Sequence, residues 1–377
     1  MRKALKFLLA VCTLLLIAEL AFLGYMLTRE PDQSVQTPAV TEAPGTEAMQ
    51  TTQMPTTVPP TTLPPEPEVF TLTFTGDFTP GCRPGQESDP KSYVGTVGED
   101  YEFPFANLRE IFAADDFTFI NLEVVLGNAG KAANKTFVFR GPEEYVQIMT
   151  SSSVEAVTLA NNHVEDFGAA GYENTKRILE ENGVAYVEED KTTLFVTESG
   201  LRIGVYADSF DFKQSDIEEN IAALREEGAE IVICAFHWGT EGAYRHNDKQ
   251  ERYAHAAIDA GADIVWGNHP HVLQEMEEYN GKMIFYSLGN FSFGGNKHPS
   301  DYDSAVVQLQ ILREYDGTIR TGELNIIPIR ISSDPDRNNY QPILYSQEEE
   351  GYQRVLDKLS GAYTGANVVP GYDYSKE

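Results

Sequence analysis

Apolar and polar residues recur along this chain with two periods, the alternation typical of strands and the wider spacing typical of helices. The segment 69–75 alternates and is rich in β-forming residues, which predicts a strand. The segment 169–182 has a helical spacing, and Gly183 behind it is a usual helix stop. The same patterns predict strands at 116–120, 154–160, 184–187, 231–236, 262–266 and 283–291, a hairpin of 192–197 with 202–207, antiparallel segments at about 304–313 and 318–330, and helices at 105–114, 142–150, 217–227 and 250–260. This order predicts a layered α/β fold, most simply an open doubly wound sheet.

The first 68 residues do not share this pattern. The run from Phe7 to Leu27 is apolar apart from Glu19, and about 20 such residues span a bilayer core. Basic residues precede it, so residues 1–30 are interpreted as a cytoplasmic end and an uncleaved transmembrane anchor. Cys12 gives a weak likeness to a lipoprotein cleavage site, but the apolar run continues beyond it. Residues 31–68 are rich in Pro and Thr and predict a disordered stalk. Residues 69–377 then form one extracellular domain of a cell-membrane protein.

That domain is strongly acidic. The chain has 58 acidic and 28 basic residues, of which 1–68 hold 7 and 4, so 69–377 carries a net charge of −27. Such a surface argues against nucleic acid or anionic lipid as a partner, and a polyanionic ligand would need a local basic or metallic site. The three cysteines do not form a disulfide framework, although a bridge between Cys82 and Cys234 is possible outside the cell.

Five predicted strands end in residues that can ligate a metal ion. In chain order these residues are Asp77, Glu123, Asn162 with His163, His237, and His269 with His271. Sites in α/β folds form at the carboxyl ends of strands, and neutral imidazole is the commonest metal ligand. The alternative for the His-x-His pair is ordinary hydrogen bonding at a strand end. The repetition at five strand ends favours a metal site.

Six motifs together make residues 71–293 resemble the CapA family, bacterial capsule-synthesis proteins tied to poly-γ-glutamate. They are Thr75-Gly76-Asp77, Asn121-Leu122-Glu123, Asn161-Asn162-His163, His237-Trp238-Gly239-Thr240-Glu241, Gly267-Asn268-His269-Pro270-His271-Val272 and Tyr286-Ser287-Leu288-Gly289-Asn290-Phe291. That family is similar to calcineurin-type metallophosphoesterases. The resemblance therefore implies a four-layer α/β-β/α sandwich with mixed sheets in place of the open doubly wound sheet.

The resemblance also implies roles. It places Asp77 and His271 on one metal ion, Asn162, His237 and His269 on another, Glu123 between them, and His163 as general acid. The donor set suits two divalent transition metal ions such as Mn, Fe or Zn. The phosphoesterase pattern begins Asp-x-His, whereas Phe78 and Thr79 follow Asp77 here, so one metal position lacks a histidine.

Three further residues are candidates for binding substrate. Arg140 is interpreted as an anion clamp, with a surface salt bridge as the alternative. Glu241 belongs to the His237 motif and is expected to line the cleft, and Asn290 to orient a ligand or cap a loop. Trp238 is equally explained by a structural role. His246, His255 and His298 do not stand at strand ends and are interpreted as surface residues.

Two functions remain open. In one, the protein assists a membrane synthase that makes, exports or retains poly-γ-glutamate or another cell-envelope polymer. In the other, it is a stand-alone metal-dependent hydrolase of phosphoester or γ-glutamyl bonds. The residues leave open whether it is an enzyme.

Overall fold

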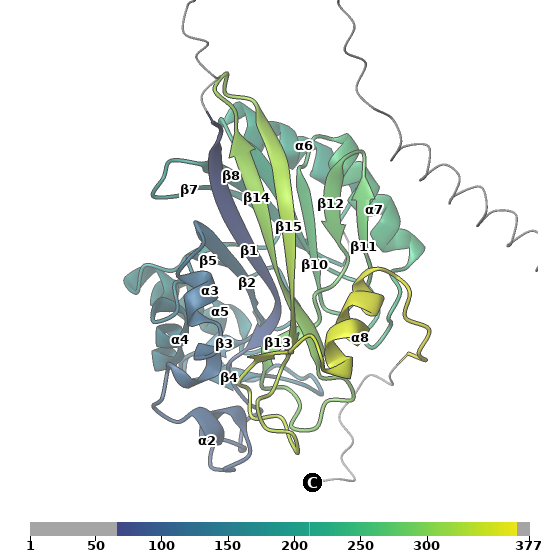
Figure 1. The fold of residues 1–377 in the computed structure, drawn as a ribbon. Helices are drawn as coiled ribbons and strands as arrows, with labels where there is room; N and C mark the ends of the chain where they lie inside the picture. Colours follow the sequence, from purple (N-terminus) through teal and green to yellow (C-terminus); the bar gives the residue numbers. More distant parts are fainter. Residues whose placement is uncertain (1–65, 211, 368–377) are drawn as a thin grey trace, which may run out of the picture. The chain divides into compact units, whose positions relative to one another are not determined.

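The computed structural model describes residues 66–210 and 212–367. The predicted anchor (1–30) and nearly all of the predicted stalk (31–68) lie outside these residues. Within the described part, no helix combines the length and the apolar character that crossing a membrane requires. The domain contains two mixed sheets and a small pair of strands (Figure 1).

The larger sheet has the strand order β16-β15-β14-β1-β2-β5-β6, with β13 paired to β1. Strands β1, β2, β5 and β6 run parallel, whereas β14, β15 and β16 are antiparallel additions at one edge. The strand bounds are β1 Glu68–Thr79, β2 Phe117–Leu122, β5 Ala156–Thr158, β6 Ala185–Val187, β13 Asn290–Phe293, β14 Asp303–Arg313, β15 Ile319–Arg330 and β16 Ile343–Leu344.

The second sheet has the order β11-β12-β10-β9-β8-β7, with four parallel strands between two antiparallel edges. Its strands are β7 Lys191–Val196, β8 Arg202–Ser209, β9 Ile231–His237, β10 Ile264–Asn268, β11 Met276–Tyr279 and β12 Lys282–Phe285. The small pair is β3 Val125–Leu126 with β4 Arg140–Gly141.

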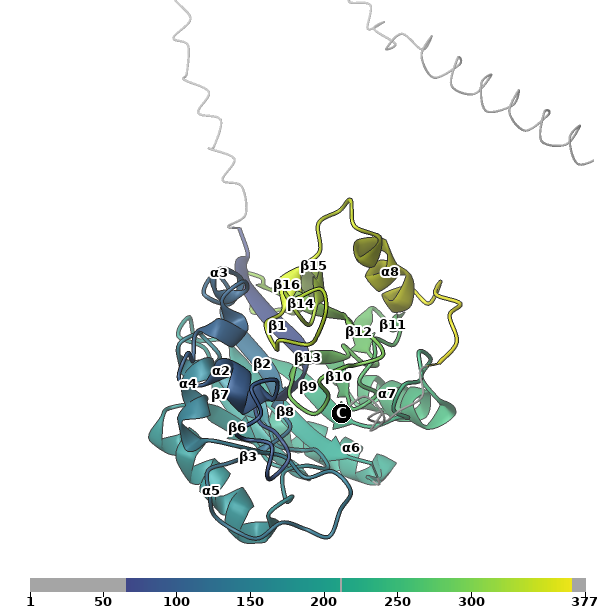
Figure 2. The ribbon, with the colours of Figure 1, turned by 90° about the horizontal axis from the view of Figure 1, so that it is seen from below.

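Helices lie on the outer faces of both sheets, and one further helix packs against the apolar cluster between the sheets. The α-helices are α2 Tyr93–Val97, α3 Arg109–Phe112, α4 Val146–Thr150, α5 Gly168–Glu181, α6 Gln214–Glu226, α7 Asp248–Asp259 and α8 Glu350–Leu359, and short 3₁₀ helices span Phe103–Phe105 and Glu143–Tyr145. Apolar residues of α3, α4 and α5 pack on the larger sheet, and those of α6 and α7 pack on the second. Figure 2 shows α3 and α4 on one side of the molecule and α7 on the other. A third apolar cluster lies between the sheets, so the fold has the four layers expected from the resemblance, and the open single sheet is a wrong prediction.

Strand alternation explains which residues face the interior between the sheets. In β9, Ile231, Ile233 and Ala235 pack between the sheets, and His237 continues that row at the strand end. In β2, Phe117 and Phe119 pack there as well, which directs Asn121 and then Glu123 to the same side. Side chains two apart in a strand share a face, so the pattern that builds the core also orients these polar residues.

β1 also directs a polar side chain to the interior between the sheets, but it does so through an irregularity in its pairing with β2. Phe74 pairs with Phe119, but Asp77 pairs with Asn121, so β1 contains one extra residue between these pairs. Such a bulge changes the face to which the following residues point. Phe74 packs between the sheets, whereas Phe78 packs toward the helices, and Asp77 is thereby directed to the interior side.

Several sequence predictions need correction. The segment 283–291 is not one strand, because β12 belongs to the second sheet and β13 to the larger one. The helices predicted at 105–114 and 142–150 are reduced to short 3₁₀ and α segments around Pro104 and after Pro142. Helix α8 was not predicted.

The two described cysteines are free and buried. The backbone of Cys82 pairs with that of Arg140 in an isolated β-bridge, whereas Cys234 packs in the cluster beneath α6 and α7. The disulfide that the sequence left open does not form in this structure.

Candidate metal centre

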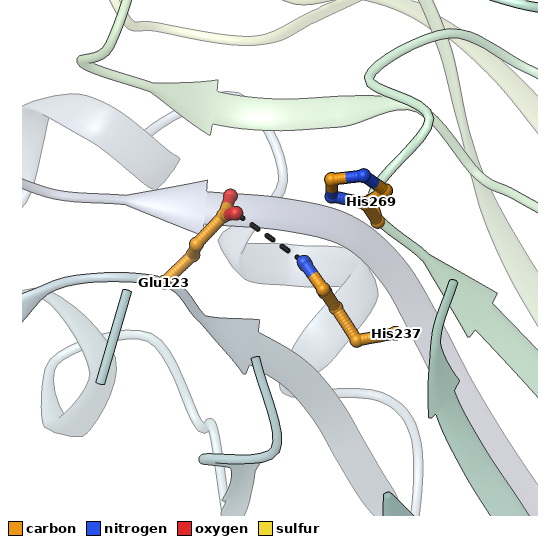
Figure 3. Close-up of side chains that lie close together, drawn as sticks. All are labelled: Glu123, His237 and His269. Carbon is orange, nitrogen blue, oxygen red and sulfur yellow. Dashed lines mark ion pairs between the residues drawn. The ribbon is translucent and has the colours of Figure 1, made fainter. Parts of the chain in front are cut away.

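The ends of strands from both sheets meet at one place. Three groups of side chains lie there with one possible ligand atom from each residue within 4.8 Å of the others. The groups are Glu123, His237 and His269; Asp77, Glu123 and His271; and Glu241, His269 and His271. Figure 3 shows Glu123 from the larger sheet facing His237 and His269 from the second. The residues expected to ligate metal are therefore brought together, and Glu241 joins them.

Both carboxylate oxygens of Asp77 are held by a neighbouring side chain. Asn121 donates a hydrogen bond of 2.7 Å to Oδ1, and Oδ2 lies 3.1 Å from Nδ1 of His271. The preceding Gly76 permits this position, because a Cβ there would lie 2.0 Å from the carbonyl oxygen of Gly289. The backbone N–H of Asp77 donates to that same carbonyl at 2.9 Å. The bulged end of β1 is thus held against the segment that crosses between the sheets.

The His-x-His segment leaves β10 in a conformation unusual for histidine. His269 has a φ of 98° and His271 a φ of 56°, both in the region that residues with a Cβ rarely adopt. Asn290 holds the second ring, since its Oδ1 lies 3.0 Å from His271 Nδ1 and its Nδ2 donates to the His271 carbonyl at 3.1 Å. Strained residues that the surroundings over-determine cluster at functional sites. Asn290, expected to orient a ligand or cap a loop, contacts the candidate ligand His271, and its contact with substrate stays a prediction.

His237 connects the two sheets. Its Nε2 lies 2.8 Å from Oδ1 of Asn162 and 3.5 Å from Oε1 of Glu123, and its Nδ1 lies 3.3 Å from Nδ2 of Asn121. The ring is 1 % exposed, and Glu123 is fully buried. Asn162 is thus placed beside the expected ligands His237 and Glu123.

Burial and mutual charge set the ionisation of the centre. Burial, with repulsion from the neighbouring histidines, lowers the pKa of His237 far below its usual value and that of His269 to about 3. Burial also raises the pKa of Glu123, and the charges of Asp77 and Glu241 add to this. At His271 burial acts to lower the pKa, but Glu123 and Asp77 outweigh it and raise the pKa to about 10.

His163 stands at the margin of the centre and has its own partner. Its Nδ1 donates to Oδ2 of Asp166 at 2.7 Å, and the same carboxylate accepts from Lys135 at 2.7 Å and from the Phe139 N–H at 2.7 Å. Burial lowers the pKa of His163, and Asp166 opposes that shift. Sequence reasoning missed Asp166; its only signal was a carboxylate three residues after a candidate histidine.

A buried amide relay was also missed as a functional element. Asn161 donates to Oδ1 of Asn121 at 3.0 Å and accepts from the His163 N–H at 3.1 Å, while Asn121 donates to Asp77. Both asparagines belong to motifs that the sequence singled out, but only the structure shows that they position ligands. This relay links the ends of β1, β2 and β5.

Arg140 does not enter the centre. Its guanidinium lies 3.5 Å from the centroid of the Phe167 ring, and its Nη2 donates to the Ala129 carbonyl at 2.7 Å. The alternative of a surface salt bridge finds no acidic partner for Arg140 among the described residues, and the anion clamp stays a prediction. Its contacts with Phe167 and Ala129 support the small β3–β4 pair and the loop before it.

The residues present fit a divalent metal ion. Oε1 of Glu123 and Nδ1 of His269 are buried polar atoms without a hydrogen-bond partner among the described residues. Native structures rarely leave such atoms unpaired, because each lost hydrogen bond costs about 1–3 kcal/mol. Carboxylate, amide and imidazole donors together suit Mn, Fe or Zn, and no thiolate lies in the three groups. A cation at this place would satisfy both orphaned atoms.

A cavity of about 500 Å³ is lined in part by Val164 and Glu165, which follow His163 in the chain. Its lining residues are Val164, Glu165, Tyr172, Glu188, Glu189, Asp190, Asp208, Ser209, Phe212, Lys213 and Asp216. Six of these are acidic and one is basic, so the cavity is unsuited to an anionic group.

Comparison with known proteins adds family information. The model of the family described as "Bacterial capsule synthesis protein PGA_cap" matches residues 71–295, more than half of the chain. The PGA biosynthesis protein CapA of Bacillus subtilis is 31% identical over 288 residues, covering 70% of this chain and 72% of the relative. The capsule biosynthesis protein CapA of Bacillus anthracis is 30% identical over 338 residues, covering 81% and 80%. The solved NAD nucleotidase of Haemophilus influenzae matches with a TM-score of 0.39 and 12% identity, over 78% of this chain and 63% of that one.

Proposed function

The chain belongs to the family of bacterial capsule synthesis proteins, and on this premise we propose that it takes part in making, exporting or retaining a poly-γ-glutamate capsule. Two relatives named for capsule or PGA biosynthesis support this role. The structural observation that carries it is the convergence of Asp77, Glu123, His237, His269 and His271 at strand ends of both sheets.

We also propose that the domain lies outside the cell. The apolar run Phe7–Leu27 would anchor the chain in the cell membrane, and residues 31–68 would hold the domain away from the surface. Synthase subunits in the same membrane are then the expected partners.

The centre is proposed to hold two divalent ions such as Mn, Fe or Zn. Asp77 and His271 would hold one ion, Asn162, His237 and His269 the other, and Glu123 would stand between them. Bound ions of this kind polarise phosphoryl or carbonyl oxygens and lower the pKa of water. The chain itself contributes fixed ligand orientation through Asn121 and Asn290.

A hydrolase acting on phosphoester or γ-glutamyl bonds is the second candidate. The His163–Asp166 pair favours it, because a carboxylate on Nδ1 holds the imidazole in one orientation and leaves Nε2 for proton transfer. The missing histidine after Asp77 favours the non-catalytic role.

An anionic polymer is expected to approach along the segment 127–140. This segment contains Lys131, Lys135 and Arg140 and no acidic residue, in a domain of net charge −27. Lys135 reaches the Asn162 carbonyl at 2.5 Å, at the margin of the centre. The acidic cavity lined in part by Val164 and Glu165 would repel the same polymer.

The test is a gene deletion in the producing cell, complemented with the wild-type chain or with His271→Ala. We expect deletion to lower cell-associated poly-γ-glutamate and only the wild type to restore it. An unchanged polymer level after deletion would overturn the capsule role. Full restoration by His271→Ala would show that the role does not need the metal centre. Screening the purified chain on phosphodiester and γ-glutamyl substrates distinguishes the hydrolase.

A further inference from the structure

The ligand position formed by Asp77, Glu123 and His271 offers only three side chains from the residues expected at this centre. Thr79 stands where the phosphoesterase pattern has a histidine, and its hydroxyl donates to Oε2 of Glu123 at 3.3 Å. Thr79 therefore supports the carboxylate and does not supply a ligand in place of the histidine. The position needs another donor from elsewhere in the chain.

Glu241 lies next to this position, because its group shares His271 with it. One of its carboxylate oxygens lies within 4.8 Å of ligand atoms of His269 and His271. Among the described residues, its carboxylate has no hydrogen bond or ion pair with a neighbour. Glu241 is only half-buried, yet its negative charge acts on both Glu123 and His271.

The backbone fixes the loop that carries Glu241. The Gly242 N–H donates to the carbonyl of Pro270 at 2.8 Å, directly between the two histidines of the His-x-His segment. The buried side chain of Gln274 donates to the Ala243 carbonyl at 2.9 Å. Gly242 has a φ of 73°, so the turn that returns the loop to Pro270 favours glycine. Glu241 is thus held beside the centre by the same segment that presents His269 and His271.

A substrate contact explains Glu241 less well. A free carboxylate at the entrance would repel a phosphoester or a poly-γ-glutamate chain, since both are anionic. A carboxylate bound to a cation has that charge neutralised. His269 is only 7% exposed and its Nδ1 has no hydrogen-bond partner among the described residues, which points independently to a missing cation in this group.

We propose that Glu241 is a metal ligand beside His269 and His271, and that it makes up for the histidine absent after Asp77. This inference rests on the proposed metal function of the site. An oxygen donor in place of an imidazole makes the position harder, which favours Mn(II) relative to Zn(II).

The test is Mn(II) binding to the purified full chain. Binding is measured by calorimetry and by the loss of the electron paramagnetic resonance signal of free Mn(II). We expect two equivalents for the wild type. For Glu241→Gln we expect one site to weaken by about 10-fold or more, the scale seen when groups supporting a metal site are changed. Glu165→Gln is the matched control, because it removes an exposed carboxylate two residues from His163 without touching the three ligand groups. Thermal unfolding in chelator checks that the variants fold alike.

A second variant addresses the donor type. Glu241→His is expected to retain two sites and to raise the affinity for Zn(II) relative to Mn(II). Two unchanged sites in Glu241→Gln would overturn the role of Glu241 and leave the metal site intact. A wild type that binds no Mn(II) or Zn(II) would instead overturn the metal site itself.

Discussion

Nδ1 of His271 lies 3.1 Å from Oδ2 of Asp77, which joins the end of β1 in the larger sheet to the segment that follows β10 in the second. The backbone N–H of His269 reaches the same oxygen at 3.3 Å. One carboxylate therefore holds the His-x-His segment in place from across the sandwich. Its own position depends on the bulge in β1 and on Asn121.

Metal ions should stabilise the chelator-treated protein, because binding to the folded state alone adds about 2.7 kcal/mol at 100 times Kd. In a large domain each kcal/mol raises Tm by about 2–4 °C, so Mn(II) is expected to raise Tm by about 5 °C or more. Asp77→Asn should lose most of that rise, and the exposed Asp100→Asn should keep it. Differential scanning calorimetry measures the shift. Equal shifts in both variants would contradict the role of Asp77.

Asn290→Ala is expected to weaken metal binding without touching a ligand directly. The substitution removes both hydrogen bonds to His271, so the ring loses its fixed orientation. Loss of such an orienting partner typically costs about 10–100-fold in metal affinity. Calorimetric titration of the variant checks this, with Asn325→Ala at the exposed face of β15 as control. An Asn290→Ala affinity equal to that of the wild type would show that Asn290 does not position His271.

The stability of the domain should fall as pH rises from about 4 to about 7. Burial is the main cause that raises the pKa of Asp115 to about 7, and the hydrogen bond from Thr118 opposes it. The folded state then holds a proton that the unfolded state has already released, so stability declines across this window and levels off above it. Asp115→Asn should flatten this decline and be more stable than the wild type at pH 8 by about 1 kcal/mol or more. Urea unfolding at pH 4, 6 and 8 tests the difference, and a constant difference between the two proteins across the series would contradict it.

Lys358 is expected to anchor α8. Its ammonium is buried and lies 2.5 Å from Asp301 and 2.7 Å from Asp303. Lys358→Met leaves these two buried carboxylates without that partner, and breaking a buried pair in this way costs about 3–5 kcal/mol. The exposed Lys131→Met should change the free energy of unfolding by no more than about 0.5 kcal/mol. Similar unfolding midpoints for both variants in urea would refute this assignment.

The amino-acid pattern predicted much of the second sheet and of the parallel strands well. The segments 231–236 and 192–197 correspond closely to β9 and β7, because both are short, the first is apolar and the second is rich in β-forming residues. The segment 283–291 was misjudged because its turn at Ser287-Leu288-Gly289 lies within an apolar run. Gly289 has a φ of 73° there, and the chain passes from one sheet to the other. Helix α8 had an apolar spacing, with Val355 and Leu359 buried, that the acidic context obscured.

The sequence alone indicated which residues stand at strand ends, since alternation with a period of two fixes the face of Asn121, Glu123 and His237 once each strand is known. It did not determine the partners of those residues. The β1 bulge that turns Asp77 inward, the Gly242–Pro270 hydrogen bond that places Glu241, and the contact of Asp166 with His163 depend on segments that are distant in sequence or on turns without a distinct pattern. Only the packing of two sheets face to face brings these side chains within ligand distance, because that packing is set by the whole core and not by any local run of residues.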